Sequence, residues 1–218
     1  MARCRFKIKK IYIESFHKDP KKADTYTQRA VKAAQSLSLD LVYDYKEADV
    51  AVLFLRPESG DYFNATPGLL ELEICENKTN IAMNGDSYTE TTVSNLNRYF
   101  EIADYMHANN GKVVTSINIT LPWILGNVEN VSDVLIAGYD TLEKAQLEVM
   151  IGAHKPHGKL PITLPKNSQV IAVDEFGKCV TCNDVPGYDK DKYLREGMTY
   201  AYEDAAGNEY KLNFGLTD

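Results

Sequence analysis

The 218-residue sequence has no apolar run near the roughly 18 residues that a membrane-spanning helix needs, so no membrane segment is expected. Its first residues are basic, but they are not followed by the apolar segment of a secretion signal. The chain also lacks an excess of positive charge, because 24 Lys and Arg stand against 31 Asp and Glu, for a net charge of −7. Nucleic acids and anionic membranes bind clustered positive charge, so neither is expected as a partner. These absences predict a cytoplasmic protein.

Motifs that mark several common enzyme classes are also missing. Neither GxGxxG nor GxxxxGK[ST] occurs, and the first strand-to-helix turn lacks the Ser-, Thr- and Gly-rich segment that wraps a flavin phosphate. No nucleotide or flavin cofactor is therefore expected. No GxSxG elbow occurs, so the sequence offers no basis for a Ser-His-Asp hydrolase site.

Cysteine is scarce, with four residues at Cys4, Cys75, Cys179 and Cys182. The last two form a CxxC pair, a spacing found in zinc sites and in redox sites. A structural zinc needs two more ligands, and no second CxxC or HxxxH pair is present. The pair also lies late in the chain, whereas a redox CxxC starts a helix after an early strand. Ordinary reduced thiols and no metal site are expected.

The rest of the sequence alternates strand-like and helix-like patterns. Residues 48–55 are apolar on both faces, which is typical of a central parallel strand covered by helices. Asp19 and Pro20 predict the N-cap and first turn of a helix, and a second helix is expected from near Thr92 to Gly111. A capping box at residues 140–143 predicts a third helix. Further strands are expected at residues 10–14, 39–43, 81–83, 112–120, 134–138, 162–164, 170–173, 199–203 and 209–212.

These elements predict the α/β fold class and a single domain over residues 1–218. A mostly parallel sheet flanked by helices is expected over about residues 9–165, followed by a β-rich C-terminal extension over about residues 166–218. The irregular stretch at residues 56–80 is long for a compact domain, and connections of that length are usually functional or disordered.

The start of that stretch carries the strongest candidate chemistry. It contains Arg56, the carboxylates Glu58 and Asp61, and the aromatic residues Tyr62 and Phe63. A carboxylic acid beside apolar rings suits general acid catalysis, and aromatic rings beside carboxylates suit a sugar, whose CH faces stack on the rings. The alternative is a solvated loop with an ion pair from Arg56 to Glu58 or to Asp61.

Other polar residues near the ends of predicted strands and helices have simpler interpretations. Glu90 is expected to serve the start of the second helix, and His107 to interact with the C-terminal dipole of that helix. His17 and the lysines after it are interpreted as a solvated helix start. Asn118 and Trp123 are interpreted as turn and packing residues.

Five segments in the second half of the chain carry a family resemblance. They are INITLPWIL at 117–125, AGYD at 137–140, GKLPITLP at 158–165, DVPGYD at 184–189 and NFGL at 213–216. In this order they resemble the C-terminal α/β sandwich domain of family-3 glycoside hydrolases, the β-glucosidase and β-xylosidase group. The resemblance extends from about residue 9 to 218. It implies a three-layer α/β/α, flavodoxin-like sandwich with six strands.

The resemblance also implies a mechanism. In the family this sandwich packs on an N-terminal (β/α)8 barrel that carries the nucleophilic Asp and most of the sugar-binding pocket. In many members it contributes the acid/base Glu from a loop after a strand, and the corresponding residue here is Glu58. The family's usual run of acidic and Gly residues is replaced by RPESGDYFNATPGLLELE, which leaves other candidates. The alternative carboxylates are Glu71, Glu73 and Glu90, and the residues expected to bind substrate are Arg56, Asp61 and Tyr62.

The leading hypothesis is therefore the C-terminal domain or subunit of a β-glycosidase that acts on a β-linked saccharide or glycoside. A chain of this length leaves no room for the barrel, so the nucleophile is expected from a barrel domain in cis or in trans. Alone, the chain is expected to be folded but inactive. The alternative hypothesis is a stand-alone, non-catalytic module of the same fold that binds a saccharide or a protein through residues 56–80.

Overall fold

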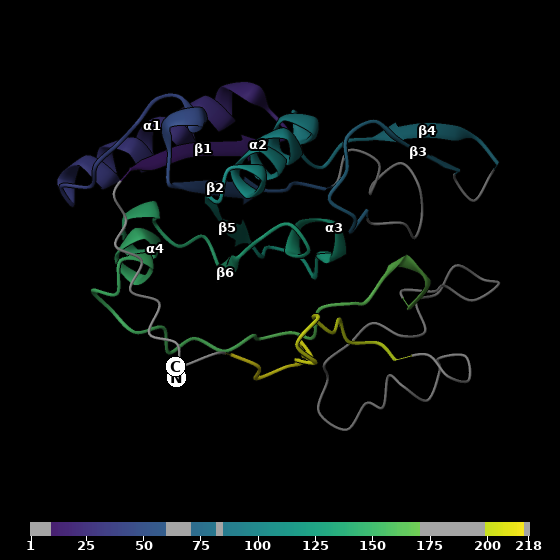
Figure 1. Ribbon diagram of the computed structural model, residues 1–218. Coiled ribbons are helices and arrows are strands. Elements are labelled where there is room, and N and C mark those ends of the chain that lie inside the picture. The colour runs from purple at the N-terminus through teal and green to yellow at the C-terminus, as the bar shows by residue number, and fades with distance from the viewer. Residues whose placement is uncertain (1–9, 60–70, 82–84, 171–198, 216–218) are drawn as a thin grey trace.

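A four-stranded parallel sheet forms the centre of the computed structural model, which describes residues 10–59, 71–81, 85–170 and 199–215 (Figure 1). The strands lie side by side in the order β1-β2-β5-β6, and every neighbouring pair is parallel. Their bounds are Ile11–His17 for β1, Val50–Arg56 for β2, Lys112–Asn118 for β5 and Val134–Gly138 for β6. All four carboxyl ends therefore meet at one edge of the sheet.

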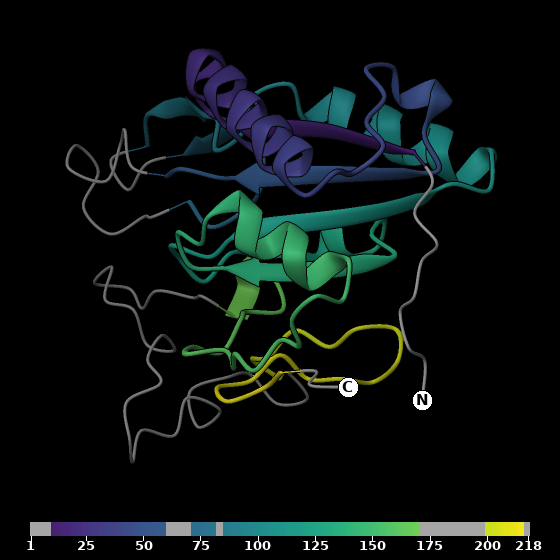
Figure 2. The ribbon, with the colours of Figure 1, turned by 90° about the vertical axis from the view of Figure 1, so that its left-hand side faces the viewer.

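Helices cover both faces of this sheet (Figure 2). On one face lie α1 (Pro20–Ser36) and α4 (Glu143–Met150), which also contact each other. On the other face lie α2 (Leu96–Ala108) and the short helix α3 (Gly126–Glu129). The three layers confirm the α/β/α sandwich that the sequence resemblance implied.

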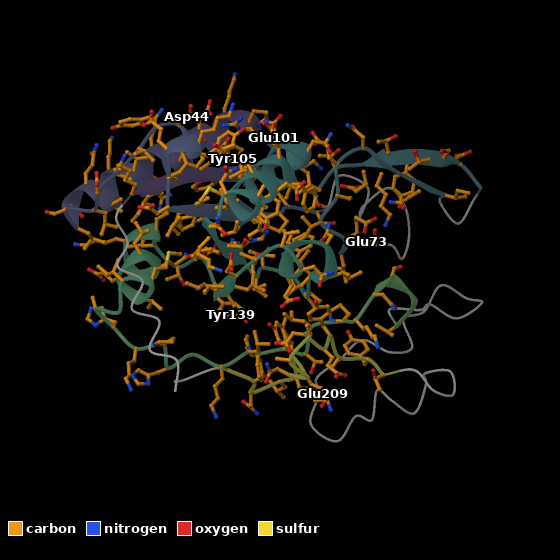
Figure 3. All side chains as sticks on the ribbon, in the orientation of Figure 1. Asp44, Glu73, Glu101, Tyr105, Tyr139 and Glu209 are labelled. Carbon is orange, nitrogen blue, oxygen red and sulfur yellow. The ribbon has the colours of Figure 1, made fainter. Side chains whose placement is uncertain are left out.

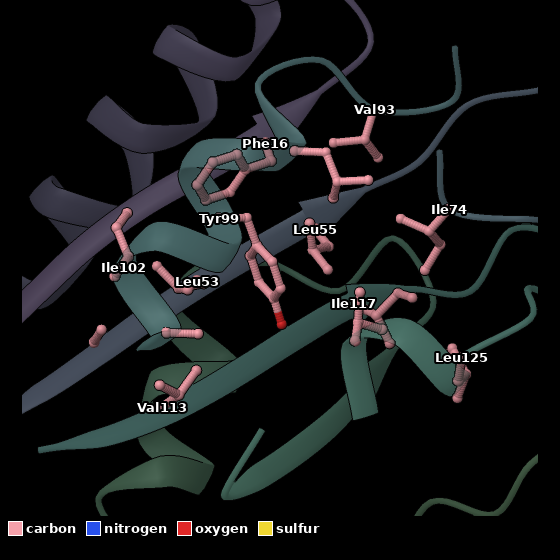
Figure 4. Close-up of a cluster of buried hydrophobic side chains, with 14 of the residues drawn as sticks. Phe16, Leu53, Leu55, Ile74, Val93, Tyr99, Ile102, Val113, Ile117 and Leu125 are labelled. Atoms are coloured by element: carbon pink, nitrogen blue, oxygen red, sulfur yellow. The ribbon is translucent and has the colours of Figure 1, made fainter. Parts of the chain in front are cut away.

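The hydrophobic core is divided by the sheet into two clusters. The larger cluster lies under α2 and α3 and includes Tyr99, Ile117 and Leu125 (Figure 4). The smaller cluster packs α1 and α4 against the opposite face of the strands. Strand β2 contributes to both clusters, and its first six residues are buried on both faces, as its continuous apolar sequence predicted.

Two helix ends follow the local signals in the sequence. The Asp19 side chain accepts a hydrogen bond from the backbone amide of Lys21 at 2.9 Å, and Pro20 is the first residue of α1. Helix α2 ends at Ala108, and the Gly111 amide then donates to the Met106 carbonyl at 2.7 Å. A Cβ atom at position 111 would meet the terminal methyl group of Met106, so a larger residue there would require the buried Met106 side chain to shift.

The number of strands differs from the prediction. Within the described residues the sheet has four strands, not six. Residues 39–43 make a single bridge, between Leu41 and Ile11, because the chain turns at Asp44 into a short 3-10 helix at Tyr45–Glu47. Near residues 81–83 the chain instead forms a separate antiparallel hairpin of β3 (Lys78–Ile81) and β4 (Ser87–Glu90).

Two predicted helix starts are also shifted. Helix α2 begins at Leu96 and not near Thr92, because the Thr92 side chain is used to hold a loop. The capping box at residues 140–143 does not form, and α4 has no side-chain N-cap. The Asp140 side chain instead accepts a hydrogen bond from the Asn118 side chain, and its amide donates back to Asn118.

The C-terminal extension is less regular than predicted. Its described residues contain two isolated antiparallel bridges, Pro165 with Ala201 and Glu203 with Glu209, and one 3-10 turn at Ser168–Val170. The extension still packs on the larger core cluster through Tyr210 and Phe214. The predicted strand at residues 170–173 lies mostly outside the described residues.

Candidate functional site

The candidate site begins where β1 and β2 end side by side. His17 is the register partner of Arg56, so the segments that leave the two strands start at neighbouring points. Ligands of parallel α/β sheets bind outside these carboxyl ends. The described part of the first segment beyond β2 ends at residue 59, so the predicted site residues Asp61 and Tyr62 lie outside the described residues.

Glu58 lies two residues beyond the carboxyl end of β2, and about half of its side chain is exposed to solvent. Its backbone amide donates to the Thr92 carbonyl at 3.0 Å, which fixes the chain two residues after β2. Its carboxylate oxygen Oε2 lies 3.3 Å from Nε2 of His17 and 3.5 Å from Nζ of Lys22 in α1. The anticipated ion pair between Arg56 and Glu58 is not the arrangement that forms.

His17 is buried beneath Glu58, which corrects the interpretation of this residue as part of a solvated helix start. Its Nδ1 accepts the backbone amide of Asp19 at 2.8 Å, and its ring lies beside the ring of Tyr26, with 5.7 Å between centroids. Burial lowers the pKa of the imidazole, and the negative charge of Glu58 partly opposes this effect. His17 is therefore neutral at neutral pH.

Arg56 points away from Glu58 and toward α4. Its guanidinium lies 3.0 Å from the Glu143 carboxylate and 4.3 Å from the centre of the Tyr26 ring. Arg29 of α1 holds the other oxygen of Glu143 at 3.2 Å, so one buried carboxylate is shared by two arginines. Within the described residues, Nε of Arg56 has no hydrogen-bond partner.

Two other candidate carboxylates, Glu71 and Glu73, share one lysine. Lys78 of β3 lies 2.9 Å from a carboxylate oxygen of each, and the Asn80 side chain donates to Glu71 at 2.8 Å. Burial disfavours the charge of Lys78, but the hydrogen bonds to the two carboxylates outweigh burial and raise its pKa. The ion cluster of Glu71, Glu73 and Lys78 lies at the start of β3, at the base of the β3–β4 hairpin, where Figure 3 labels Glu73.

Glu90, the last residue of β4, does not serve the start of α2. Its side chain is buried and lies 3.5 Å from Nζ of Lys18, the residue after β1. The amides at the start of α2 donate to another carboxylate: Asn95 and Leu96 each donate to Glu76 at 2.9 Å. A carboxylate at a helix N-terminus is favoured by the helix dipole, and here it comes from a distant segment that sequence spacing could not identify.

Thr92 is a residue of the site that the sequence analysis missed. It is fully buried, and its hydroxyl donates to the Glu73 carbonyl and accepts the Cys75 amide, both at 2.9 Å. Its own amide donates to the Cys75 carbonyl, and its carbonyl accepts the Glu58 amide. Thr92 thus joins the segments on either side of residues 60–70 at one point. No local signal distinguishes it from any threonine before a helix.

The remaining polar residues have structural environments. Trp123 is fully buried and donates from its indole to the Asn118 carbonyl at 3.2 Å, as the packing interpretation predicted. His107 lies in the last turn of α2, where Nε2 is 3.0 Å from a carboxylate oxygen of Asp133. Burial raises the pKa of the Cys75 thiol, while the other three cysteines lie outside the described residues.

Within the described ranges, no three His, Cys, Asp or Glu side chains form a group that could hold a metal ion. Among the helices in the same part of the chain, none combines the length and the apolar character needed to cross a membrane.

Comparison of the sequence with known proteins identifies its family. No curated protein matches the sequence. Among solved structures, the beta-glucosidase D2-BGL from Chaetomella raphigera is similar at 17% identity and a TM-score of 0.41, over 76% of this chain and 27% of the beta-glucosidase chain. The chain thus spans about a quarter of that protein's length. The family model "Glycosyl hydrolase family 3 C-terminal domain" matches residues 9–216, nearly the whole sequence. The chain therefore belongs to the C-terminal domain family of the family-3 glycosyl hydrolases.

Proposed function

We propose that this domain completes the active site of a β-glycosidase barrel and that Glu58 is the acid/base residue. Family membership supports the glycosidase context. The observation that carries the assignment is the exposure of the four candidate side chains: 52% for Glu58, against 34% for Glu73, 10% for Glu71 and 3% for Glu90. A carboxyl group that transfers a proton to a glycosidic oxygen has to reach that oxygen.

The partners of the four carboxylates favour the same residue. Glu71 and Glu73 are bound to Lys78, and Glu90 is buried beside Lys18. A close cation favours the ionised form of a carboxyl group and works against proton donation. Glu58 has a neutral imidazole at 3.3 Å and one exposed lysine at 3.5 Å, so it is the least constrained of the four.

In the proposed mechanism, docking on the barrel removes water around Glu58, which favours the protonated form of a carboxyl group. Glu58 then donates its proton to the glycosidic oxygen as a barrel carboxylate attacks the anomeric carbon. In the second step Glu58 takes a proton from the water that releases the sugar. Such a retaining pair requires the two carboxyl groups to lie about 5 Å apart in the assembly.

The substrate in this proposal is a β-linked saccharide or glycoside. Asp61 and Tyr62 would contact it from the same loop as Glu58, with the phenol ring stacking on a sugar face. Arg56 would bind the substrate from the start of that loop. Its guanidinium lies between Glu143 and Tyr26, and its Nε has no hydrogen-bond partner among the described residues.

The first test is hydrolysis of a panel of aryl β-glycosides by the chain alone, by the family-3 barrel from the same source, and by the two mixed. If both parts occur on one polypeptide, the full-length protein replaces the mixture. We expect activity only in the mixture or the full-length protein. Activity of the chain alone would contradict the mechanism, because it would require a nucleophile within this domain.

The acid/base role is tested by Glu58→Gln in the active assembly. It should lower kcat/KM on phenyl or alkyl glycosides by about 10²–10⁴-fold, the usual contribution of general acid–base catalysis. A dinitrophenyl glycoside, whose leaving group departs without protonation, should lose far less in bond cleavage. The matched control is Glu47→Gln, an exposed glutamate at the opposite edge of the sheet, which should leave both rates unchanged.

Two outcomes would redirect the assignment. If Glu71→Gln, Glu73→Gln or Glu90→Gln shows the leaving-group dependence and Glu58→Gln does not, the acid/base residue is that carboxylate. If the assembly forms but hydrolyses no glycoside, the domain is the non-catalytic binding module, and saccharide binding by the chain should then be measured directly.

A further inference from the structure

His17 has features that its place at the end of a buried strand does not require. Its ring is almost completely buried, yet both ring nitrogens face polar partners, Asp19 at Nδ1 and Glu58 at Nε2. A histidine that only filled space would not need two such contacts. The second contact is with the carboxylate that the proposed function assigns as the acid/base.

The hydrogen bond at Nδ1 fixes the tautomer of the ring. The backbone amide of Asp19 can only donate, so Nδ1 of His17 must accept and carries no proton. In the neutral ring the proton therefore sits on Nε2, and this nitrogen lies 3.3 Å from Oε2 of Glu58, a close contact in which the N–H is not aligned on the oxygen as a hydrogen bond. Because Asp19 is also the N-cap of α1, the start of that helix sets the ring orientation.

The groups that face His17 have mixed charge. Asp19, Lys22 and Tyr26 approach from α1, while Arg56 and Glu58 approach from the end of β2. Burial lowers the pKa of His17, with Lys22 and Arg56 acting in the same direction and Glu58 and Asp19 opposing them. The ring therefore presents Glu58 with a neutral N–H donor.

We propose that His17 is the positioning residue of Glu58, holding its carboxyl group through the Nε2–H donor while leaving it free to gain and lose a proton. This inference rests on the proposed function for its catalytic meaning. A neutral donor can bond to either form of a carboxyl group, whereas a close, buried cation would favour the ionised form. The Lys22 ammonium group at 3.5 Å from the same oxygen is half exposed, so solvent screens its charge. His17 thus fixes the geometry of Glu58 without fixing its charge.

The contact is tested first on the isolated chain, without any glycoside. Ring nitrogen NMR at neutral pH should show His17 as the Nε2–H tautomer, with exposed His154 as the reference in the same spectrum. Glu58→Gln should move the His17 titration to lower pH, because it removes a negative charge at 3.3 Å. Lys22→Gln is the matched control and should move the titration in the opposite direction, because it removes a positive charge.

The Nδ1–H tautomer, or a His17 titration unaffected by Glu58→Gln, would overturn the proposal whatever the domain's function. These measurements need only conservative variants on the surface of the site, so they do not depend on a His17 variant that folds.

The catalytic consequence is tested in the active assembly with His17→Gln, which keeps an N–H donor, and His17→Phe, which removes it. His17→Phe should lower kcat on phenyl glycosides by about ten- to a hundredfold, the worth of one hydrogen bond to a charged group, and change KM little. His17→Gln should recover most of that loss. Equal losses in both variants would reject the positioning role. An assembly inactive with the unaltered chain would instead reject the proposed function, while the NMR result would still decide on the contact.

Discussion

Two glutamates near the carboxyl ends of the strands, Glu58 and Glu143, differ mainly in how far their side chains are exposed to solvent. The Glu58 side chain is half exposed, with the neutral His17 ring at 3.3 Å and the Lys22 ammonium group at 3.5 Å. The Glu143 side chain is 4% exposed and sits between Arg56 and Arg29. A solvated ion pair contributes little to stability, whereas removing one partner of a buried pair leaves an uncompensated charge. The same residue type therefore has a candidate chemical role at position 58 and a structural role at position 143.

Alanine substitutions separate these two roles. Glu143→Ala should destabilise the fold by about 3–5 kcal/mol, because Arg56 stays buried without its carboxylate. At about 2–4 °C per kcal/mol for a chain of this size, the melting temperature should fall by roughly 6 °C or more. Glu58→Ala should lower it by less than about 5 °C. Thermal unfolding followed by circular dichroism measures both, and similar losses in the two variants would contradict the distinction.

At the scale of elements, the segments whose signals are local were predicted well. Strand β2 is a continuous apolar run, and α1 begins with an N-cap and a proline. The β3–β4 hairpin was not predicted because its pattern is inverted. Lys78 and Glu90 face inward, while Ile81 is 69% exposed. Apolar alternation cannot locate strands whose inner face is polar.

The candidate site was predicted in the same partial way. The position of Glu58 after β2 followed from the order of strands and from the family resemblance. Its partners did not, because His17, Lys22 and Thr92 come from other elements. The parallel pairing of β1 and β2 brings His17 and the start of α1 to Glu58, and a backbone hydrogen bond joins Thr92 to it. The pairing of Arg56 with Glu143 likewise depends on how α4 packs against α1.

Hydrogen bonds of Thr92 hold together the two ends of the loop after β2, so a substitution at this position should destabilise them. Thr92→Val keeps the shape of the side chain but leaves the Cys75 amide without its acceptor in a buried place. An unsatisfied buried group costs about 1–3 kcal/mol. Urea unfolding should show that loss, and hydrogen exchange at the Cys75 amide should become faster. The matched control is Thr91→Val, which removes a hydroxyl bonded to the exposed Asn77 amide and should cost less. Equal costs would mean that Thr92 has no special role.

At the scale of the whole molecule, segments that lie far apart in the described sequence pack into one core cluster. The larger core cluster joins β-strand residues such as Leu53, residues of α2, and Leu164 from the segment after α4. Phe214, near the C-terminus, packs against the same cluster. Trp123, the single tryptophan of the chain, is fully buried inside it. Its fluorescence therefore reports on the packing of the sheet, the helices and the described part of the C-terminal extension together, while one domain over residues 1–218 stays a prediction.

Lowering the pH should reduce the free energy of unfolding in two separate pH ranges, an upper and a lower window. The folded-state pKa of His17 lies below its ordinary value of 6.5, chiefly because of burial, so the unfolded chain binds this proton first as the pH falls. The stabilisation is complete above about pH 6.5 and is lost between that value and the folded pKa. The slope from one proton is at most about 1.4 kcal/mol per pH unit.

The second window belongs to two aspartates. Burial disfavours the charges of Asp133 and Asp204, but hydrogen bonds, chiefly from Lys112 and from Asn208 respectively, outweigh burial and lower both pKa values below 3.8. Their contribution is present above pH 3.8 and is lost as the pH falls through the folded-state values. Urea unfolding followed by Trp123 fluorescence at a series of pH values should resolve both windows. His17→Gln should remove the upper one and keep the lower one. If a slope near pH 6 persists in that variant, another group causes it, because a glutamine at position 17 cannot bind the proton on which the upper window depends.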